Sequence, residues 1–270
     1  MGKSYTTLKF FEHYLQSKRW DAFHSPFLFS LFTACCNEKH REQDFYDIEA
    51  LRRKLKSSRE VISPVDLGAG SFRSGQTHKK TIGKIARDAL SYSFQGRFLY
   101  RMAQFVQPSR MVELGTSLGI TTAYMALGAK NAVIDSVEGD PAIASKASEV
   151  FKELGINNVT IHQEPFSQFL ERGFASTPEP GIIFIDGHHT GAAVQSYYLS
   201  ILPFVHERTI LVIDDIYWWA DMQQGWQTLK DRPEVTQSVD CFHFGLLFFS
   251  SDFKCREHHI TRLPLRMQLS

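Results

Sequence analysis

The stretch Glu113-Leu114-Gly115-Thr116-Ser117-Leu118-Gly119 decides the fold of this chain of 270 residues. It continues a compact apolar run over residues 110–114, and residues 120–128 after it have a helical pattern. A glycine at each end of the bend lets the backbone approach a ligand that a Cβ atom would block. A strand, a glycine-rich turn and a helix in this order predict an α/β sheet that binds its ligand at the turn.

The same alternation of short β-rich runs and helical segments continues along the chain. The predicted strands are residues 110–114, 132–137, 158–162, 181–186 and 209–214. The predicted helices are residues 120–128, 141–154, 166–172, 191–202 and 219–230. Residues 239–244 and 246–250 predict an antiparallel hairpin that turns at Gly245 and closes an edge of the sheet. We therefore predict a doubly wound, mostly parallel, seven-stranded sheet with helices on both faces, which is a Rossmann-like architecture.

The first part of the chain has a different sequence pattern. Apolar residues at helical spacing, among them Phe10, Phe11 and Tyr14, predict helices, and residues 62–78, rich in Gly, Ser and Pro, predict a loop. We therefore divide the chain into a helical N-terminal cap, residues 1–95, and a ligand-binding domain, residues 96–270. Residues 1–100 carry 17 Lys and Arg against 10 Asp and Glu. We interpret this basic excess as a solvated helix surface, and an anionic partner is the alternative.

Composition disfavours several classes of protein. The four cysteines form no C-x-x-C pair, which disfavours a zinc site or a disulfide framework and predicts a cytoplasmic protein. No apolar run approaches the ~20 residues that span a bilayer, and the start of the chain lacks a secretory signal, so we expect no membrane partner. The absence of a nucleic-acid-binding motif disfavours a nucleic-acid partner. The sequence leaves a monomer and a homo-oligomer equally open.

Two glycine-rich segments compete as the ligand-binding turn. The earlier one, residues 65–71, has no helix directly after it and no second strand with an acidic end, so we interpret it as a surface turn. The later one meets both requirements, because the strand after it ends in Glu138, 19 residues beyond Gly119. A carboxylate there can accept hydrogen bonds from both hydroxyls of a ribose. Thr116 replaces the second glycine of a dinucleotide-binding turn, and Glu113 would repel a pyrophosphate but suits an ammonium group.

These residues, with Val137-Glu138-Gly139, resemble the cofactor motifs of class I S-adenosylmethionine-dependent methyltransferases over about residues 95–250. The resemblance implies that the turn binds the methionine part of the cofactor, that Glu138 holds the ribose, and that the segment after the third strand reads the adenine. The residues it assigns to the cofactor are Glu113, Gly115, Thr116, Ser117, Gly119, Glu138, Gly139, Glu164 and Asp186. The order of elements also resembles uncharacterised bacterial methyltransferases with a helical N-terminal extension.

Acidic residues end the two following strands. Asp186 ends one strand, and Asp214 and Asp215 end the next. Asp214 lies 28 residues after Asp186 in the sequence. Adjacent parallel strands bring their carboxyl ends to one edge of the sheet, where ligands bind. Three carboxylates there repel one another unless they are protonated, paired or neutralised, and Mg²⁺ would neutralise them. Asp215 as a helix cap, and Asp186 as a cofactor contact without a metal, are the alternatives.

This acidic pattern resembles the metal site of catechol-type O-methyltransferases, with Asp186, Asp214 and Asp215 on the metal-binding positions and Trp218 shortly beyond. Asp215 departs from the asparagine that is usual there. Sugar O-methyltransferases with a similar site carry a histidine soon after the first aspartate, which places His189, or else His188, in the role of catalytic base. A metal ion lowers the pKa of an acceptor hydroxyl, and a histidine can remove its proton near neutrality.

We therefore interpret the chain as an S-adenosylmethionine-dependent methyltransferase that methylates a hydroxyl of a small molecule with Mg²⁺, using Asp186 and His189 as catalytic residues. The Asn/Asp-Pro-Pro-Tyr segment of enzymes that methylate adenine or glutamine nitrogen is absent, which further disfavours a nucleic-acid acceptor. Two alternatives stay open. One is an NAD-type oxidoreductase on the same fold, and the other is a noncatalytic module that binds the cofactor and uses the basic cap to hold a partner.

Overall fold

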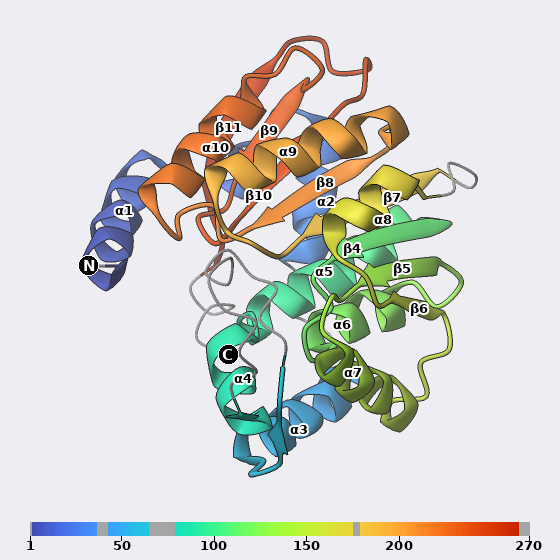
Figure 1. Cartoon of the computed structure of the whole chain (residues 1–270). Helices are drawn as coiled ribbons and strands as arrows, with labels where there is room; N and C mark the ends of the chain where they lie inside the picture. The colour runs from blue at the N-terminus through green and yellow to red at the C-terminus, as the bar shows by residue number, and fades with distance from the viewer. Residues whose placement is uncertain (1, 37–42, 65–78, 175–178, 265–270) are drawn as a thin grey trace.

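Nine strands form one sheet in the computed structural model, which describes residues 2–36, 43–64, 79–174 and 179–264 (Figure 1). The strand order is β1-β11-β9-β10-β8-β7-β4-β5-β6, and among these strands only β10 runs antiparallel to its neighbours. The chain proceeds from β4 outward through β5 and β6, and then returns to build β7 and β8 on the other side of β4. Because the order reverses between β4 and β7, the carboxyl ends of these strands mark the place where open α/β sheets bind ligands.

The described elements have the following bounds. The strands of the sheet are β1 (Lys18–Arg19), β4 (Arg110–Leu114), β5 (Val133–Val137), β6 (Val159–His162), β7 (Pro180–Ile185), β8 (Ile210–Asp214), β9 (Gln237–Asp240), β10 (Phe244–Phe248) and β11 (Glu257–Arg262). Strands β2 (Val61–Ile62) and β3 (Lys80–Thr81) pair with each other. The helices are α1 (Gly2–Gln16), α2 (Pro26–Cys35), α3 (Gln43–Ser57), α4 (Ile82–Ala89), α5 (Ser93–Val106), α6 (Ile120–Gly128), α7 (Pro141–Glu153), α8 (Phe166–Arg172), α9 (Gly191–Ile201) and α10 (Ala220–Lys230), with short 3₁₀ turns η1 (Trp20–Ala22) and η2 (Leu202–Phe204).

Alternate residues of the central strands face two different apolar cores. Met111 and Ile182 are buried with residues of α2, α5 and α6, whereas Val112 and Ile183 are buried with residues of α8, α9 and α10. Strand side chains point alternately to the two faces of a sheet, so a strand buried on both faces is apolar throughout. Helices therefore cover both faces (Figure 1), and the predicted doubly wound, mostly parallel sheet is confirmed.

The predicted number of seven strands was wrong, because two further strands extend the sheet beyond β9. Strand β11 pairs in parallel with β9, and β1 pairs in parallel with β11. Four of the six residues of β11 are charged residues or histidines, and β1 has only two residues. Neither segment carries an apolar alternation, so only its pairing with the rest of the sheet makes it a strand.

The predicted hairpin exists, but its turn and its position in the sheet were wrong. Gly245 lies inside β10, opposite Asp240 of β9, and the connection is made by residues 241–243. Phe242 has φ +71°, and its N–H donates to the Asp240 carboxylate over 2.9 Å, as in an Asx-type turn. A Cβ atom on Gly245 would lie 2.5 Å from the Trp226 ring, so the glycine serves helix packing and not the turn. Strand β10 is internal, because β8 and β9 flank it.

The N-terminal segments pack along the sheet and its helices rather than standing apart. Buried residues of α2 and α3, such as Phe32 and Ile48, belong to the same apolar core as Met111 of β4. Helix α1 lies at the side of the molecule, beside β11 and α10 (Figure 1). None of the described helices combines the length and apolarity that crossing a bilayer requires. The division of the chain at residue 95 stays a prediction.

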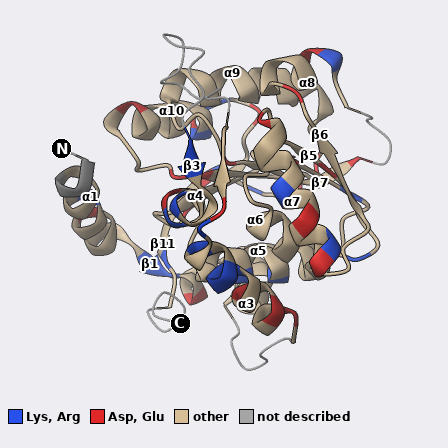
Figure 2. Cartoon of the chain, turned by 60° about the horizontal axis from the view of Figure 1, so that its bottom comes forward, with Lys and Arg blue, Asp and Glu red and all other residues tan. Residues whose placement is uncertain are grey.

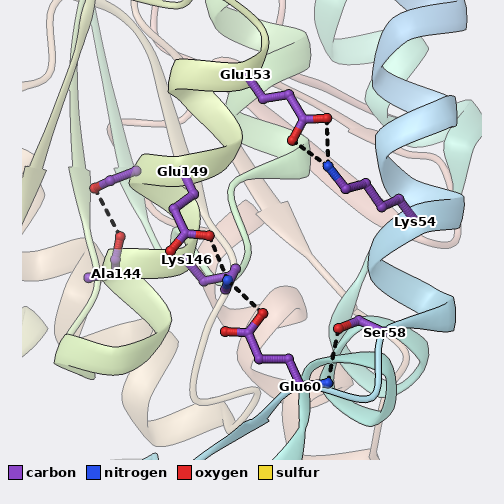
Figure 3. A network of polar contacts seen from close by, with 8 residues as sticks. Lys54, Ser58, Glu60, Ala144, Lys146, Glu149 and Glu153 are labelled. Carbon is purple, nitrogen blue, oxygen red and sulfur yellow. Dashed lines mark hydrogen bonds and ion pairs between the residues drawn. The ribbon is translucent and has the colours of Figure 1, made fainter.

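Charged residues of both signs occur on α3 and α7 (Figure 2). Lys54 of α3 lies 2.8 Å from Glu153 of α7, and Lys146 of α7 contacts both Glu149 (2.6 Å) and Glu60 (2.8 Å), as Figure 3 shows. These ion pairs join the segment before β2 to the helix that follows the predicted ribose-binding residue. Surface ion pairs contribute little stability, so these contacts add little to the free energy of folding.

Candidate active site

The glycine-rich turn after β4 has the backbone geometry that requires glycine. Gly115 has φ +111° and Gly119 has φ +77°, both in the region that residues with a Cβ rarely adopt. A Cβ atom on Gly115 would lie 1.9 Å from the carbonyl oxygen of Asp186, so the turn after β4 is in direct contact with the end of β7. A Cβ atom on Gly119 would lie 2.8 Å from the Phe151 ring of α7. Gly115 thus sets the shape of the ligand edge, and Gly119 sets the approach of α7.

Glu138 holds this turn from the end of β5. Its carboxylate accepts hydrogen bonds from the N–H of Ser117 (2.9 Å) and from the N–H of Asp140 (3.0 Å). Burial raises the pKa of Glu138, while these backbone donors oppose the shift. A carboxylate has about four acceptor sites, so these backbone donors do not use all of them and a hydroxyl group of a ligand can still be bound.

A cavity of about 350 Å³ opens at this edge of the sheet. Its described lining comes from the turn, from the ends of β5 and β7, from the start of α8 and from the segment around α4: Pro64, Lys80, Ile85, Asp88, Ala89, Gly115, Ser117, Glu138, Gly139, Asp140, Ile143, Pro165, Phe166, Asp186, Gly187 and His188. Four of these side chains are carboxylates, against one lysine. The cavity therefore favours a ligand with positive charge and disfavours a pyrophosphate.

Five of the nine residues that the sequence assigned to the cofactor line this cavity, namely Gly115, Ser117, Glu138, Gly139 and Asp186. The other four do not line it. Thr116 and Gly119 support the turn, since the Thr116 hydroxyl hydrogen-bonds the Ser136 hydroxyl at 2.6 Å and Gly119 packs on α7. Glu164 forms an ion pair with Arg172 at 2.6 Å, and its neighbours Pro165 and Phe166 line the cavity instead.

Glu113 is fully buried beneath the turn. Its Oε2 accepts hydrogen bonds from the hydroxyls of Thr122 (2.6 Å) and Ser136, and its Oε1 has no partner among the described residues. Burial raises the pKa of Glu113 to about 7, and the two hydroxyl donors oppose that rise. An unpaired buried carboxylate oxygen next to the cavity fits the positively charged end of a cofactor better than a phosphate.

The Glu113→Gln variant should make folding stability less dependent on pH. The folded state binds the Glu113 proton more tightly than the unfolded state, so this residue contributes stability below pH 4.5 that is lost as the pH rises through about 7. The shift corresponds to roughly 3 kcal/mol. Urea unfolding of both proteins from pH 5 to pH 8 should show a smaller loss for the variant. Parallel curves for the two proteins would contradict the assignment.

A second cluster lies where β7 and β8 end. The His189 ring lies with Nε2 3.8 Å from the Asp186 carboxylate and Nδ1 3.8 Å from the Asp215 carboxylate. The Trp218 ring lies beside it, with ring centroids 5.9 Å apart. His188, His189 and Asp215 all have positive φ angles (59°, 20° and 54°). Non-glycine residues adopt such angles rarely, and they cluster at functional sites.

Burial and mutual repulsion shift the pKa values in this cluster. Burial raises the pKa of Asp186 well above its ordinary value, and the charges of Asp215 and Glu113 add to the rise. Burial also raises the pKa of Asp214, with Asp186 and Asp215 adding to it. Burial lowers the pKa of His189, although Asp215 opposes the shift. The histidine is therefore neutral at pH 7 and able to accept a proton.

The metal-site prediction finds no support in the geometry of the cluster. Among the residues that the structure describes, no three His, Cys, Asp or Glu side chains are arranged to hold a metal ion. Asp214 instead accepts a hydrogen bond from the Gln95 amide at 2.8 Å, and Asp215 lies beside His189. As placed, Asp186, Asp214 and Asp215 do not form a ligand set. Asp215 is not a helix cap either, because α10 begins after Trp219 without a side-chain cap.

The two candidate bases occupy different places. His188 lines the cavity, and its Nδ1 hydrogen-bonds the Tyr197 hydroxyl. His189 lies between Asp186 and Asp215 and next to the half-exposed Trp218. A base must reach the acceptor rather than the cofactor, so the position of His189 beside the cavity suits it better for that role.

The sequence did not identify the residues that the N-terminal part contributes. Lys80, Ile85 and Asp88 line the cavity, and Gln95 binds Asp214. At the start of α5 the Gln95 side chain accepts a hydrogen bond from the Tyr92 N–H, but a tyrosine at the N-cap does not fit the sequence pattern of a capping box. No signal in the sequence therefore predicts the contact of Gln95 with an aspartate 119 residues away. The other glycine-rich segment, residues 65–71, lies outside the described residues.

The chain is similar to known proteins in part of its sequence and in its fold. Residues 112–216 match a family described as a methyltransferase domain. No curated protein matches the chain in sequence. Similar solved structures include a putative O-methyltransferase from Klebsiella pneumoniae (18% identity, covering 79% of this chain and 93% of that one, TM-score 0.55). An S-adenosylhomocysteine-bound methyltransferase from Podospora anserina is also similar (15% identity, 85% and 97% coverage, TM-score 0.57).

A third similar structure is an O-methyltransferase from Streptomyces achromogenes, involved in tomaymycin synthesis and solved with S-adenosylmethionine (14% identity, 93% and 99% coverage, TM-score 0.55). At such identities these structures establish the fold, and the family match adds the kind of domain. The matched segment contains the glycine-rich turn, Glu138, Asp186 and the end of β8. Residues 112–216 are similar to a methyltransferase domain, and the sheet has the same fold as these solved methyltransferases.

Proposed function

We propose that this protein transfers the methyl group of S-adenosylmethionine to a hydroxyl group of a small molecule, with His189 as the base. The observation that carries the proposal is the acidic cavity at the glycine-rich turn, with a neutral histidine placed between two carboxylates at its side. Charge is the decisive property. The cofactor carries a sulfonium and an ammonium group, whereas NAD carries a pyrophosphate that the carboxylate lining would repel.

The residues of the turn fit the cofactor in distinct ways. Gly115 and Ser117 expose backbone at the cavity, and Glu138 has acceptor sites left for the ribose hydroxyls. Glu113 is buried in the strand that leads into the turn, and its Oε1, which has no hydrogen-bond partner among the described residues, favours a positive charge nearby. Phe166 and Ile143 supply apolar lining that suits an adenine ring.

When bound, S-adenosylmethionine supplies an electrophilic methyl group on sulfur. The task of the protein is to position the acceptor hydroxyl in line with that group and to remove its proton. His189 accepts the proton, because burial keeps its ring neutral, and Asp215 stabilises the imidazolium that forms. Trp218 provides a flat, half-exposed surface beside the base for the acceptor.

Calorimetry with S-adenosylhomocysteine and with NAD tests the choice of cofactor. We expect S-adenosylhomocysteine to bind and NAD to give no heat; binding of NAD alone would show a nicotinamide oxidoreductase instead. A panel of hydroxyl-bearing small molecules, assayed by release of S-adenosylhomocysteine, then tests catalysis. Protein that binds the cofactor but methylates nothing in the panel would indicate a noncatalytic module.

Magnesium is tested in the same assay. A rate that survives a chelator would show that the three aspartates act without a metal ion. Loss of activity with EDTA, restored by Mg²⁺, would instead show that Asp186, Asp214 and Asp215 rearrange around the ion when the acceptor binds.

A further inference from the structure

A second cavity, of about 560 Å³, lies beside helix α1 and is separate from the first in its lining. Its described lining residues come from α1, from the β1–η1 segment, from the β9–β10 connection and from the end of β11. They are Phe10, His13, Tyr14, Arg19, Trp20, Cys241, Phe242, His243, Arg262, Leu263 and Pro264. The function proposed above uses none of them.

This cavity lies at the ligand-binding edge of the sheet. Strands β9, β11 and β1 run parallel to β8, since β10 is antiparallel to both β8 and β9. Their carboxyl ends at Asp240, Arg262 and Arg19 therefore lie along the same edge as Asp214. The N–H of Asp215 donates to the carbonyl oxygen of His243 over 2.7 Å, which places the wall of the second cavity one hydrogen bond from the catalytic cluster. Open α/β sheets bind ligands along this edge.

The charge in the second cavity is opposite to that in the first. Arg19 and Arg262 both line it, and they are directly paired residues of the parallel strands β1 and β11. Like charges on paired residues repel each other, and an anion between them would remove the repulsion. Arg19 has one ion pair, with Asp21 at 2.8 Å, and Arg262 lies 5.0 Å from the centre of the Tyr14 ring. The described lining contains no aspartate or glutamate.

The buried polar residues next to the cavity already have hydrogen-bond or ion-pair partners within the protein. The Asp240 carboxylate takes hydrogen bonds from Phe242 N–H (2.9 Å) and the Tyr217 hydroxyl (2.8 Å), and it lies 3.0 Å from His13 Nε2. Burial lowers the pKa of His243 to about 4, so this ring is neutral at pH 7. The two arginines therefore supply the charge that a ligand in this cavity would meet.

The rest of the wall is aromatic. Phe10 and Phe242 pack edge to face with ring centroids 5.1 Å apart, and His13 lies 5.4 Å from the same Phe242 ring. Tyr14 and Trp20 complete the aromatic lining. A pocket with several aromatic side chains and a few convergent polar groups is the usual form of a small-molecule site.

We infer that this cavity is a second ligand site, for a small organic anion with a flat apolar body, such as an aromatic carboxylate or sulfonate. The arginines bind the anionic group, since guanidinium matches carboxylate and sulfonate oxygens in geometry and charge. The aromatic residues cover the apolar body. The inference does not depend on methyl transfer, because it concerns residues that the proposed function leaves unused.

The test uses two dyes of nearly the same shape on the full-length protein. The first is 8-anilinonaphthalene-1-sulfonate, which carries the anion, and the second is N-phenyl-1-naphthylamine, which lacks it. We expect the double variant Arg19→Gln/Arg262→Gln to bind the sulfonate dye about 10-fold to 100-fold more weakly. This is the range expected for lost charge-assisted hydrogen bonds. The affinity of the neutral dye should stay within about twofold, because its contacts are apolar. Fluorescence titration measures both.

Matched controls separate this site from non-specific binding. Arg53→Gln/Arg208→Gln removes two exposed arginines that do not line the cavity, and it should leave both affinities unchanged. If the double variant does not fold, the single variant Arg19→Gln is used. The Arg19 side chain is 68% exposed, so its replacement should not prevent folding. Saturating S-adenosylhomocysteine should not displace the sulfonate dye. Full displacement, or equal loss of sulfonate binding in both double variants, would overturn the inference.

Discussion

The Gly115→Ala variant is expected to lose at least about 100-fold in affinity for S-adenosylhomocysteine, because a displacement of about 1 Å at a positioned site has effects of that size. The new Cβ would lie 1.9 Å from the Asp186 carbonyl oxygen, and φ is +111°. The backbone must therefore move, and with it the segment that exposes Gly115 and Ser117 to the cavity. Calorimetry with S-adenosylhomocysteine measures the loss.

Gly155→Ala is the matched control for this variant. Gly155 also has a positive φ (+66°), but a Cβ there would meet nothing within 4 Å. We expect this variant to lose about 1 kcal/mol of stability from the backbone conformation alone and to keep the affinity of the natural protein. If Gly115→Ala does not fold, Glu138→Gln tests the same edge without placing a Cβ atom in the turn, and it should weaken binding by replacing an acceptor oxygen with a donor. Natural affinity in both site variants would refute the assignment of the turn.

Replacing His189 by glutamine should lower kcat by about 10²-fold to 10⁴-fold, the usual contribution of a general base. The affinity for S-adenosylhomocysteine should change little, because His189 does not line the cofactor cavity. The assay uses whichever hydroxyl acceptor the panel identifies. His188→Gln is the matched comparison, and we expect a smaller loss of kcat from it. A larger loss from His188→Gln would transfer the role of base to that residue.

The pH profile gives a second readout of the same assignment. Because burial lowers the pKa of His189 below its ordinary value of 6.5, the neutral base is present at pH 7 and is lost as the pH falls through that lowered pKa. The rate of the natural enzyme should therefore fall in acid with a midpoint below pH 6.5. The residual activity of His189→Gln should lack this acid limb. A limb that persists in the variant would mean that another group titrates.

The core of the fold could be predicted from the sequence because its signals are local. Strand β4 and helices α6 and α8 have the predicted bounds, and the other four strand–helix units differ by a residue or two at the ends. In each unit an apolar run, a turn and a helical segment follow one another, and a parallel sheet buries both faces of such strands. Glu138 was found in the same way, from its distance to the turn and its position at a strand end.

The outer strands and the walls of the site could not be predicted, since they depend on residues far apart in the chain. Arg19 meets Arg262 across β1 and β11, and Gln95 meets Asp214, without any pattern in the intervening sequence. Gly245 was taken for a turn residue although Trp226 packs over it. Three carboxylates at strand ends suggested a metal site. In the folded chain Asp214 instead accepts a hydrogen bond from Gln95, and Asp215 lies beside His189.

The sequence by itself determined the parallel sheet, the glycine turn and the acidic strand ends, because backbone sterics and hydrophobic periodicity act over a few residues. Only the tertiary structure decided which carboxylates lie beside which partners, which histidine lies between them, and that a second, basic cavity shares their edge of the sheet. Burial and charge repulsion depend on distances in space, and these exist only after distant segments have packed together.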